Sequence, residues 1–311
     1  MKIGIVGAGI AGLSCAEALQ AAGHAVRLFD KGRGAGGRMA TRRAATPFGD
    51  VAFDHGAQYF TARDPCFAAA VTDWQASGVV APWPGAGDEA WVGTPGMNAV
   101  VKALSEPLAV QWNSPVDALR RVERYWFLDS VVDDPFDAVI VATPAEQAAP
   151  LLAAHDPAMA KLALGSPSAP CWTVMVAFRE RIAIAKDIIR DVGIIGWAAR
   201  SSAKPGRTGM EAWVIQATAD WSHDHIEDEE ATVVDALLAT LAAEATAALP
   251  EPVVRNAHRW RYARAGAAQH GALWNDTRRI GAVGDWLLAP RVESAWLSGR
   301  MLADRIIATG R

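Results

Sequence analysis

The sequence is poor in cysteine and lysine, and it has no long apolar run. Its 311 residues include three cysteines, Cys15, Cys66 and Cys171, which lie far apart and form no CxxC pair. This spacing excludes a disulfide framework and a redox dithiol and is typical of a reducing compartment, so we expect a cytoplasmic protein. Because no stretch of 18 consecutive apolar residues occurs, we expect no membrane span.

The charge balance is equally restrictive. A formal net charge of -4 and a sequence pI of about 6.0 provide no basic field for nucleic acid. A hydrophobic content of 51% over this length allows a large core, and we expect two lobes in a monomer or homodimer. Tryptophan is abundant, with 13 residues. We expect most of them to anchor the core and some to line a pocket for a flat ligand.

The first 30 residues carry a nucleotide-binding pattern. The apolar run 3–6 predicts a buried parallel strand, and GAGIAG at 7–12 leads into a helical pattern that ends at Ala22. The three glycines permit, in order, a tight turn, a close approach of the backbone to a pyrophosphate, and close packing of helix on strand. A second strand, 25–29, ends in an acid placed to bind the ribose of an adenosine. The predicted contacts are Gly7, Gly9, Ile10, Ala11, Gly12 and Asp30.

A glycine-dense loop, KGRGAGGRMAT at 31–41, follows this acid. Here the chain resembles the superfamily of FAD-binding flavoproteins that includes the monoamine oxidases, whose members place a Gly-Gly-Arg segment just after the ribose acid. The resemblance implies that the Arg38 guanidinium forms bidentate hydrogen bonds with the FAD pyrophosphate. The alternative is that the loop is a solvent-exposed basic turn. Superfamily members usually carry Glu where this chain has Asp30. The predicted FAD contacts in the loop are Lys31, Arg33, Gly37, Arg38 and Met39.

The segment VAFDHGAQYFT at 51–61 resembles the renalase family most closely, including its bacterial members. The resemblance implies that Gly56 and Ala57 lie beside the flavin ring and that Gln58 and Tyr59 face flavin or substrate. For Tyr59, packing in the core is an alternative of equal weight.

Two later segments, SSAKPGR at 201–207 and AHRWRYA at 257–263, also resemble bacterial renalases. If the second is a strand, His258, Trp260 and Tyr262 share one face and the two arginines, 259 and 261, share the other. The resemblance then implies that His258 and Trp260 face the flavin and help to bind a flat substrate ring. The alternative is that His258 has only a structural role. The arginines, Lys204 or Arg207 are candidates for substrate phosphates.

The C-terminal segments IGAVGDW at 280–286 and RVESAWLSGRMLA at 291–303 resemble the C-terminal FAD signature of the superfamily. The resemblance implies that Asp285 binds a ribityl hydroxyl and that a helix from about Glu293 directs its N-terminal amides at the flavin. Ser294 stands where the oxidases usually have glycine. The predicted contacts are Gly284, Asp285, Arg291, Val292, Glu293 and Ala295. No flavinylation motif occurs, so FAD should be noncovalent.

These segments together predict an α/β fold, with a Rossmann-like FAD-binding domain assembled from discontinuous segments and a mixed β-sheet substrate domain with helices. Helices are expected at 65–77, 98–105 and 228–249, and no regular structure at 81–97. Strands are expected at 108–116, with Val116 near the cofactor, at 137–144, with Thr143 near it, and at 170–178, 193–201, 211–219 and 253–263. We expect residues 1–64, 98–163 and 272–311 in the FAD-binding domain and 65–97 and 164–271 in the substrate domain.

Three functions fit the sequence. The resemblance favours a renalase-type oxidase, in which hydride passes from 2- or 6-dihydro-NAD(P) to flavin N5 and dioxygen reoxidises the flavin, giving NAD(P)+ and H2O2. A dihydropyridine becomes aromatic on losing hydride and needs stacking rather than a general base, and the sequence has no clear acid/base pair. A flavin-dependent amine oxidase is the second reading, with Lys204 as its lysine and Trp260 or Trp286 completing an aromatic cage. The third is an FAD-bound binding or sensing protein. No metal site and no separate NAD(P)H domain are expected.

Overall fold

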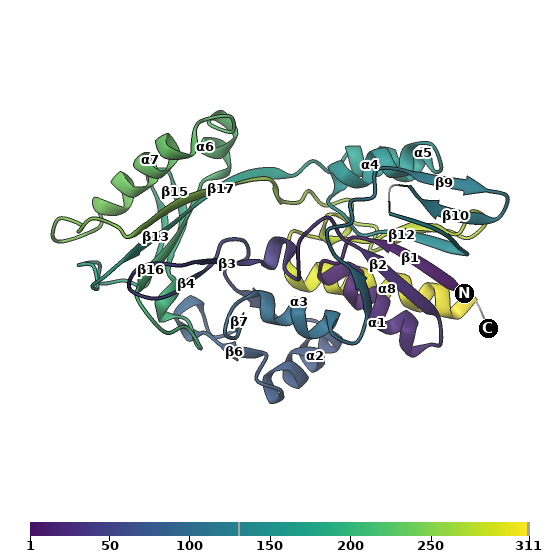
Figure 1. The fold of residues 1–311 in the computed structure, drawn as a ribbon, viewed down its shortest axis with the longest axis horizontal. Coiled ribbons are helices and arrows are strands. Elements are labelled where there is room, and N and C mark those ends of the chain that lie inside the picture. The colour runs from purple at the N-terminus through teal and green to yellow at the C-terminus, as the bar shows by residue number, and fades with distance from the viewer. Residues whose placement is uncertain (130, 310–311) are drawn as a thin grey trace.

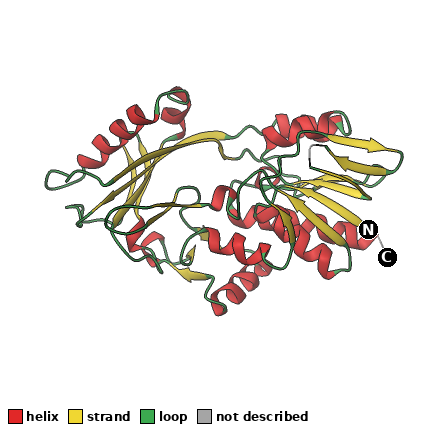
Figure 2. Ribbon diagram, in the orientation of Figure 1, coloured by secondary structure: helices red, strands yellow, loops and turns green. Residues whose placement is uncertain are grey.

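The computed structural model describes residues 1–129 and 131–309, which form two lobes around two different sheets. Figure 1 shows the parallel strands β1, β2 and β12 at one end of the molecule and the antiparallel strands β13, β15, β16 and β17 at the other. The N-terminus and the last described helical turn of the chain lie together beside the parallel sheet (Figure 2). In the described part of the chain, no helix is both long enough and apolar enough to cross a membrane.

A six-stranded sheet forms the centre of the first lobe. Its order is β18-β19-β12-β1-β2-β8, with every neighbouring pair parallel except β18 with β19. The strands are β1 (Lys2–Val6), β2 (Ala25–Phe29), β8 (Ala109–Gln111), β12 (Ala138–Val141), β18 (Leu273–Asn275) and β19 (Ile280–Ala282). The expected α/β class and the discontinuous Rossmann-like sheet are therefore confirmed.

Helices cover both faces of this sheet. On one face α1 (Ile10–Ala21) packs against α8 (Val292–Thr309) and α3 (Asn98–Ser105), around alternate residues such as Ile3 and Ile5. On the other face Val139 and Val141 pack on α4 (Ala145–Ala153) and α5 (Pro157–Leu164), beside the three-stranded sheet β9 (Leu119–Val122), β10 (Tyr125–Leu128) and β11 (Val132–Phe136). This alternation follows from burial of both sheet faces.

The second lobe is built on a five-stranded sheet of order β14-β15-β16-β13-β17. Its strands are β13 (Ala169–Phe178), β14 (Ile188–Val192), β15 (Ile195–Arg200), β16 (Glu211–Ala217) and β17 (Val254–Arg264). The expectation of mixed strand directions is wrong, because every neighbouring pair is antiparallel. One face is covered by α6 (Ala219–Asp224) and α7 (Glu230–Ala242), and the other packs on β3 (Thr41–Ala44) and β4 (Val51–Asp54).

The expectation of an irregular segment at 81–97 is also wrong. β6 (Val80–Pro82), the 3-10 helix η2 (Pro84–Ala86) and β7 (Ala90–Gly93) occupy it, and β7 pairs with both β6 and β5 (Phe60–Thr61). These strands lie beside α2 (Pro65–Ala76). The local Pro and Gly residues mark turns between short strands rather than an absence of strands.

Several element boundaries differ from the sequence expectations. The strand expected at 108–116 is confined to β8, because it is an edge strand paired only with β2, and Asn113 turns away with a φ of 53°. The helix expected at 228–249 ends at Ala242, and its last part is turn and loop. The remaining 3-10 helices are η1 (Gly37–Met39), η3 (Ser201–Ala203) and η4 (Asp285–Leu287).

Candidate functional site

A cavity of about 720 Å³ lies between the ends of the parallel strands and the antiparallel sheet. Most of the predicted site residues line it: Gly9, Ile10, Ala11, Arg38, Met39, Gly56, Ala57, Gln58, Tyr59, Thr143, Trp260, Gly284, Asp285, Arg291, Val292, Glu293 and Ala295. Eight others do not: Gly7, Gly12, Asp30, Lys31, Arg33, Gly37, Val116 and His258. The structure therefore brings together residues from the first 11 and the last 20 positions of the chain.

The turn from β1 into α1 forms one wall. Gly7 adopts a φ of +104°, and a Cβ atom there would lie 2.7 Å from the carbonyl oxygen of Ala142, so only glycine fits this turn. Nothing lies within 4 Å of a Cβ placed on Gly9, which faces the cavity. The first turn of α1 contains no acid. Its free amides and dipole therefore suit a pyrophosphate.

The carboxylate of Asp30 lies beside this turn. Its Oδ2 accepts from the Ala8 amide at 2.7 Å, and its Oδ1 accepts from the Gly32 amide at 2.6 Å. Asp30 thus fixes the loops that follow β1 and β2. Lys31 and Arg33, in the loop after β2, are not among the residues that line the cavity, although Gly36 of the same loop is.

Arg38 and Asp285 form an ion pair on the cavity wall. The guanidinium donates to both carboxylate oxygens, with Nη1···Oδ2 at 2.8 Å and Nη2···Oδ1 at 2.7 Å. The Arg38 side chain retains 30% exposure. Sequence reasoning placed these two residues on different parts of FAD, whereas here they join η1 to η4. The buried hydroxyl of Thr143, also in the lining, has no hydrogen-bond partner among the described residues.

The N-terminus of α8 supplies another part of the wall through Val292 and Ala295. Glu293 is buried, and its Oε1 accepts from the backbone amides of Arg63 at 2.6 Å and Asp64 at 2.7 Å. These amides precede α2. The Glu293 carboxylate therefore holds the loop that closes this side of the cavity, and the amide end of α8 is left to face a ligand.

A buried polar cluster lies directly behind the segment that carries Gly56 and Gln58. Asp54 Oδ2 accepts from Lys204 Nζ at 3.4 Å and from Arg207 Nη2 at 2.5 Å. Asp54 Oδ1 accepts from the Met97 amide and the Thr41 hydroxyl, both at 2.8 Å. The side chains of Asp54, Lys204 and Arg207 are at most 5% exposed. We call these three residues the Asp54 cluster.

The Asp54 cluster orients Gln58. Lys204 Nζ donates to Gln58 Oε1 at 3.1 Å, and the Gln58 amide then donates to the carbonyl of Gly56 at 3.0 Å. Burial lowers the pKa of Lys204 to about 8, although the Asp54 carboxylate opposes the shift. Burial alone would raise the pKa of Asp54, but Lys204 and Arg207 together hold it below its ordinary value. Lys204 itself does not line the cavity.

Aromatic side chains from both lobes form the substrate-lobe side of the cavity. Trp260 stacks on His55 at 5.1 Å, and its indole donates to the His55 carbonyl at 2.8 Å. His258 lies behind Trp260, with edge contacts to Trp260 at 4.3 Å and to His55 at 5.0 Å. Burial, with His258 and Arg42 nearby, lowers the pKa of His55 to about 4. Burial and Arg42 also lower the pKa of His258.

Along β17, His258 and Trp260 lie on one face and Arg259 and Arg261 on the other, as predicted. The arginines, however, do not face the cavity. Arg259 and Arg261 both form ion pairs with Glu227, Arg259 Nη1 at 2.7 Å and Arg261 Nη1 at 2.7 Å, on the face covered by α6 and α7. The hypothesis that these arginines meet substrate phosphates is therefore wrong. Arg207 pairs with Asp54 and does not line this cavity. The cavity arginines are Arg38, Arg63, Arg264 and Arg291.

The cavity residues that the sequence did not predict include Cys171, Trp197, Gln216 and Arg264. Trp197 contacts Tyr59 at 5.4 Å, and Gln216 donates to the Gly56 carbonyl at 2.8 Å. Burial raises the pKa of the Cys171 thiol to about 11, which makes it a poor nucleophile. Each lies on a strand of the antiparallel sheet, and which strand residues face the cavity depends on how that sheet packs on the cofactor lobe. Only the unusually high tryptophan content pointed to Trp197.

Comparisons with known proteins agree with this geometry. Residues 5–74 match the model of an NAD(P)-binding Rossmann-like domain, and residues 83–307 match that of flavin containing amine oxidoreductases. Among solved structures, cyclohexylamine oxidase from Brevibacterium oxydans IH-35A is 14% identical, with 99% of each chain covered and a TM-score of 0.73. A putrescine oxidase double mutant is 14% identical, with 99% of each chain covered and a TM-score of 0.68.

A third structure, reduced UDP-galactopyranose mutase, is 12% identical, with 99% of this chain and 94% of that chain covered and a TM-score of 0.75. At these identities the solved structures establish the fold alone. The class of protein comes from the family match over residues 83–307, which is to flavin containing amine oxidoreductases. The chain therefore belongs to the flavin-containing amine oxidoreductase family and is an oxidase.

Proposed function

We propose that this protein is a renalase-type oxidase that binds FAD without a covalent bond and oxidises 2- or 6-dihydro-NAD(P). Bound FAD would supply the hydride acceptor, and its reoxidation by dioxygen with one proton would balance the reaction as NAD(P)+ and H2O2. The observation that carries the proposal is the position of Lys204. Its Nζ is fully buried, paired with Asp54 and Gln58, and outside the cavity lining.

The cavity lacks a base suited to proton abstraction. Among the described residues that line it there is no lysine and no histidine. Two of its three carboxylates are committed, Asp285 to Arg38 and Glu293 to backbone amides, while Asp191 is exposed. A dihydropyridine gains aromaticity on losing hydride and requires orientation alone. Trp260 offers a flat ring for that purpose.

The aromatic pairs argue in the same direction. An amine cage needs two rings with a gap between them. Tyr59 and Trp197 are separated by only 5.4 Å between ring centroids, and Trp260 and His55 by 5.1 Å, so each pair is in mutual contact. Neither pair leaves room for an amine. The arginines Arg63 and Arg264 in the lining would instead suit the phosphates of a dinucleotide.

The residues present fit FAD in particular. The acid-free start of α1 and Arg38 would bind the pyrophosphate, and the amide end of α8 would face the flavin ring. The unpartnered Thr143 hydroxyl would donate to the cofactor. Cys15 is buried in α1, and burial raises the pKa of its thiol, which supports noncovalent binding. When FAD binds, Arg38 would divide its donors between Asp285 and a phosphate.

A flavin-dependent amine oxidase is the second candidate. The similarity of fold to cyclohexylamine oxidase and putrescine oxidase favours it. It would require Lys204 to reach the cavity, which means breaking its contacts to both Asp54 and Gln58.

Anaerobic rapid mixing separates the two candidates. The holoprotein is mixed with 2-dihydro-NAD(P), 6-dihydro-NAD(P), the 4-dihydro form or a primary amine, and flavin absorbance is followed. We expect rapid bleaching by a 2- or 6-dihydro isomer, slower bleaching by the 4-dihydro form and none by amines. Readmission of air should yield one H2O2 for each dihydronicotinamide. Bleaching by amines alone would replace the proposal with the second candidate.

A further inference from the structure

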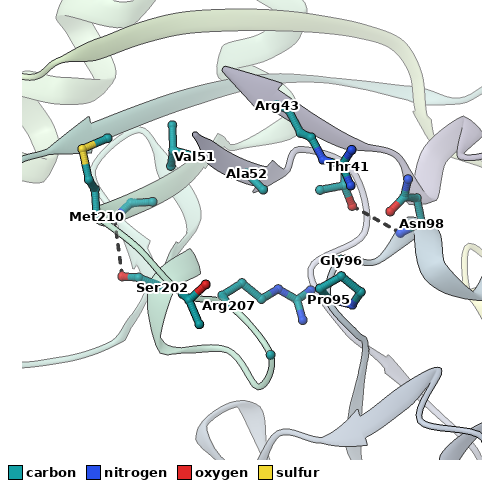
Figure 3. A pocket seen from close by; sticks show the side chains of 13 residues that line it. Thr41, Arg43, Val51, Ala52, Pro95, Gly96, Asn98, Ser202, Arg207 and Met210 are labelled. Carbon is teal, nitrogen blue, oxygen red and sulfur yellow. Dashed lines mark hydrogen bonds between the residues drawn. The ribbon is translucent and has the colours of Figure 1, made fainter. Parts of the chain in front are cut away.

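A second pocket, of about 150 Å³, lies on the far side of the Asp54 cluster from the flavin cavity. It is enclosed by β3, β4, the Pro95–Gly96 turn and the loop after η3 (Figure 3). Its volume is about tenfold the roughly 10–15 Å³ that one water molecule requires. It is therefore large enough for a small polyatomic ion.

Two arginines approach this pocket from different elements. Figure 3 shows Arg43 on β3 and Arg207 in the loop after η3, both with side chains in the lining. Arg207 is 5% exposed, and three of its N–H groups donate to Gly93, Pro205 and Asp54. A guanidinium has five N–H donors. Two donors of a nearly buried cation therefore remain available beside the pocket.

The rest of the lining adds donors and no carboxylate. The Arg43 guanidinium and the side-chain amide of Asn98 form no hydrogen bond with other described residues, and Ser202 and Thr208 contribute hydroxyls. Two acids close to the lining are paired: Asp54 with Lys204 and Arg207, and Glu211, which accepts from Ser202, with Arg200. The lining itself contains two arginines and no carboxylate.

From these observations we propose that the pocket is a binding site for a small oxyanion, a phosphate or a carboxylate group, held between Arg43 and Arg207. Guanidinium donors match the oxygen spacing of such groups and bind them through charge-assisted pairs. The site is separate from the flavin cavity, since the two linings share no residue. An anion there would share Arg207 with Asp54 and so contact the cluster that orients Gln58.

Calorimetric titration of the holoprotein with inorganic phosphate tests the proposal. The titration uses a chloride buffer free of phosphate and sulfate, at constant ionic strength and without substrate. We expect saturable binding at one site in the natural protein and at least tenfold weaker binding in Arg43→Ala. Arg305→Ala is the matched control, because Arg305 is an exposed residue of α8 that forms no ion pair in the described part of the chain. It should bind phosphate unchanged.

A second variant fills the pocket without changing charge. Ala52→Leu places three additional carbon atoms in the lining (Figure 3) and should also abolish binding. A parallel titration with acetate shows whether the site prefers a phosphate or a carboxylate group. We expect phosphate to bind more tightly because it presents more acceptor oxygens. No saturable heat with either anion, or equal phosphate affinity in the natural protein, Arg43→Ala and Ala52→Leu, would overturn the proposal.

Discussion

Two groups of paired charges lie on either side of the segment that carries Gly56 and Gln58, and they differ in their exposure to solvent. Arg38 and Asp285 pair on the cavity wall, where the arginine keeps 30% of its exposure. Asp54, Lys204 and Arg207 pair behind the wall, almost entirely out of solvent. A partly exposed pair can exchange one partner for a ligand, whereas a fully buried one must keep every charge matched. The comparison separates residues that bind from residues that hold the binding surface in place.

The largest effect should come from removing the carboxylate of the buried cluster. Asp54→Asn leaves Lys204 and Arg207 as unmatched buried cations, and we expect a loss of about 3–5 kcal/mol in the free energy of unfolding. Urea denaturation of the holoprotein measures it. Asp129→Asn is the control, because its partner Arg120 is 49% exposed, and it should cost less than about 1 kcal/mol. Equal losses in the two variants would contradict the comparison.

Breaking the pair on the wall should affect the cofactor more than the fold. Arg38→Ala removes charge-assisted hydrogen bonds worth about 1.5–3 kcal/mol, so we expect FAD affinity to fall about 10- to 100-fold. Quenching of flavin fluorescence on titrating apoprotein into FAD gives the affinity. Arg300→Ala removes a comparably exposed arginine that pairs with Glu17 outside the cavity, and its FAD affinity should not change. An Arg38→Ala protein with undiminished affinity would remove Arg38 from the cofactor site.

The pH dependence of stability can show that Lys204 is buried. The pKa of Lys204 is lowered to about 8 in the folded protein from 10.5, so between these values the unfolded chain binds more protons. Stability should therefore rise with pH across this window in the natural protein. Lys204→Met should lack this rise. The difference between their urea midpoints at pH 7 and pH 10 isolates the effect, and identical pH profiles would place Lys204 in solvent.

The smallest effect should come from His258, which lies behind Trp260 and outside the lining. His258→Ala removes edge contacts worth about 0.5–1.5 kcal/mol, and we expect flavin reduction at saturating substrate to slow by about 2- to 10-fold, with FAD still bound. Trp260→Leu, which changes the wall itself, should slow reduction further. A larger loss for His258→Ala than for Trp260→Leu would make His258 a direct substrate contact.

The sequence predicted the cofactor lobe better than the substrate lobe for a physical reason. The signals in 7–12 and 280–286 are local, since each glycine or acid acts within its own turn or helix end. The pairing of β13 with β16 and β17 joins segments far apart in the chain, and whether Trp197 faces the cavity depends on how the whole sheet packs on the other lobe. The Asp54 cluster was also hidden, because Asp54 and Lys204 lie 150 residues apart and only the folded chain shows that they meet.

The cavity is completed by residues near both ends of the chain, Gly9 to Ala11 at the start of α1 and Arg291, Val292, Glu293 and Ala295 at the start of α8. During synthesis, the β1–α1 turn therefore emerges long before the other residues that line the cavity. The cofactor cannot be fully enclosed until the ribosome has made almost the entire polypeptide. Loss of even the last helix should leave the nucleotide-binding turn intact in sequence yet unable to retain flavin.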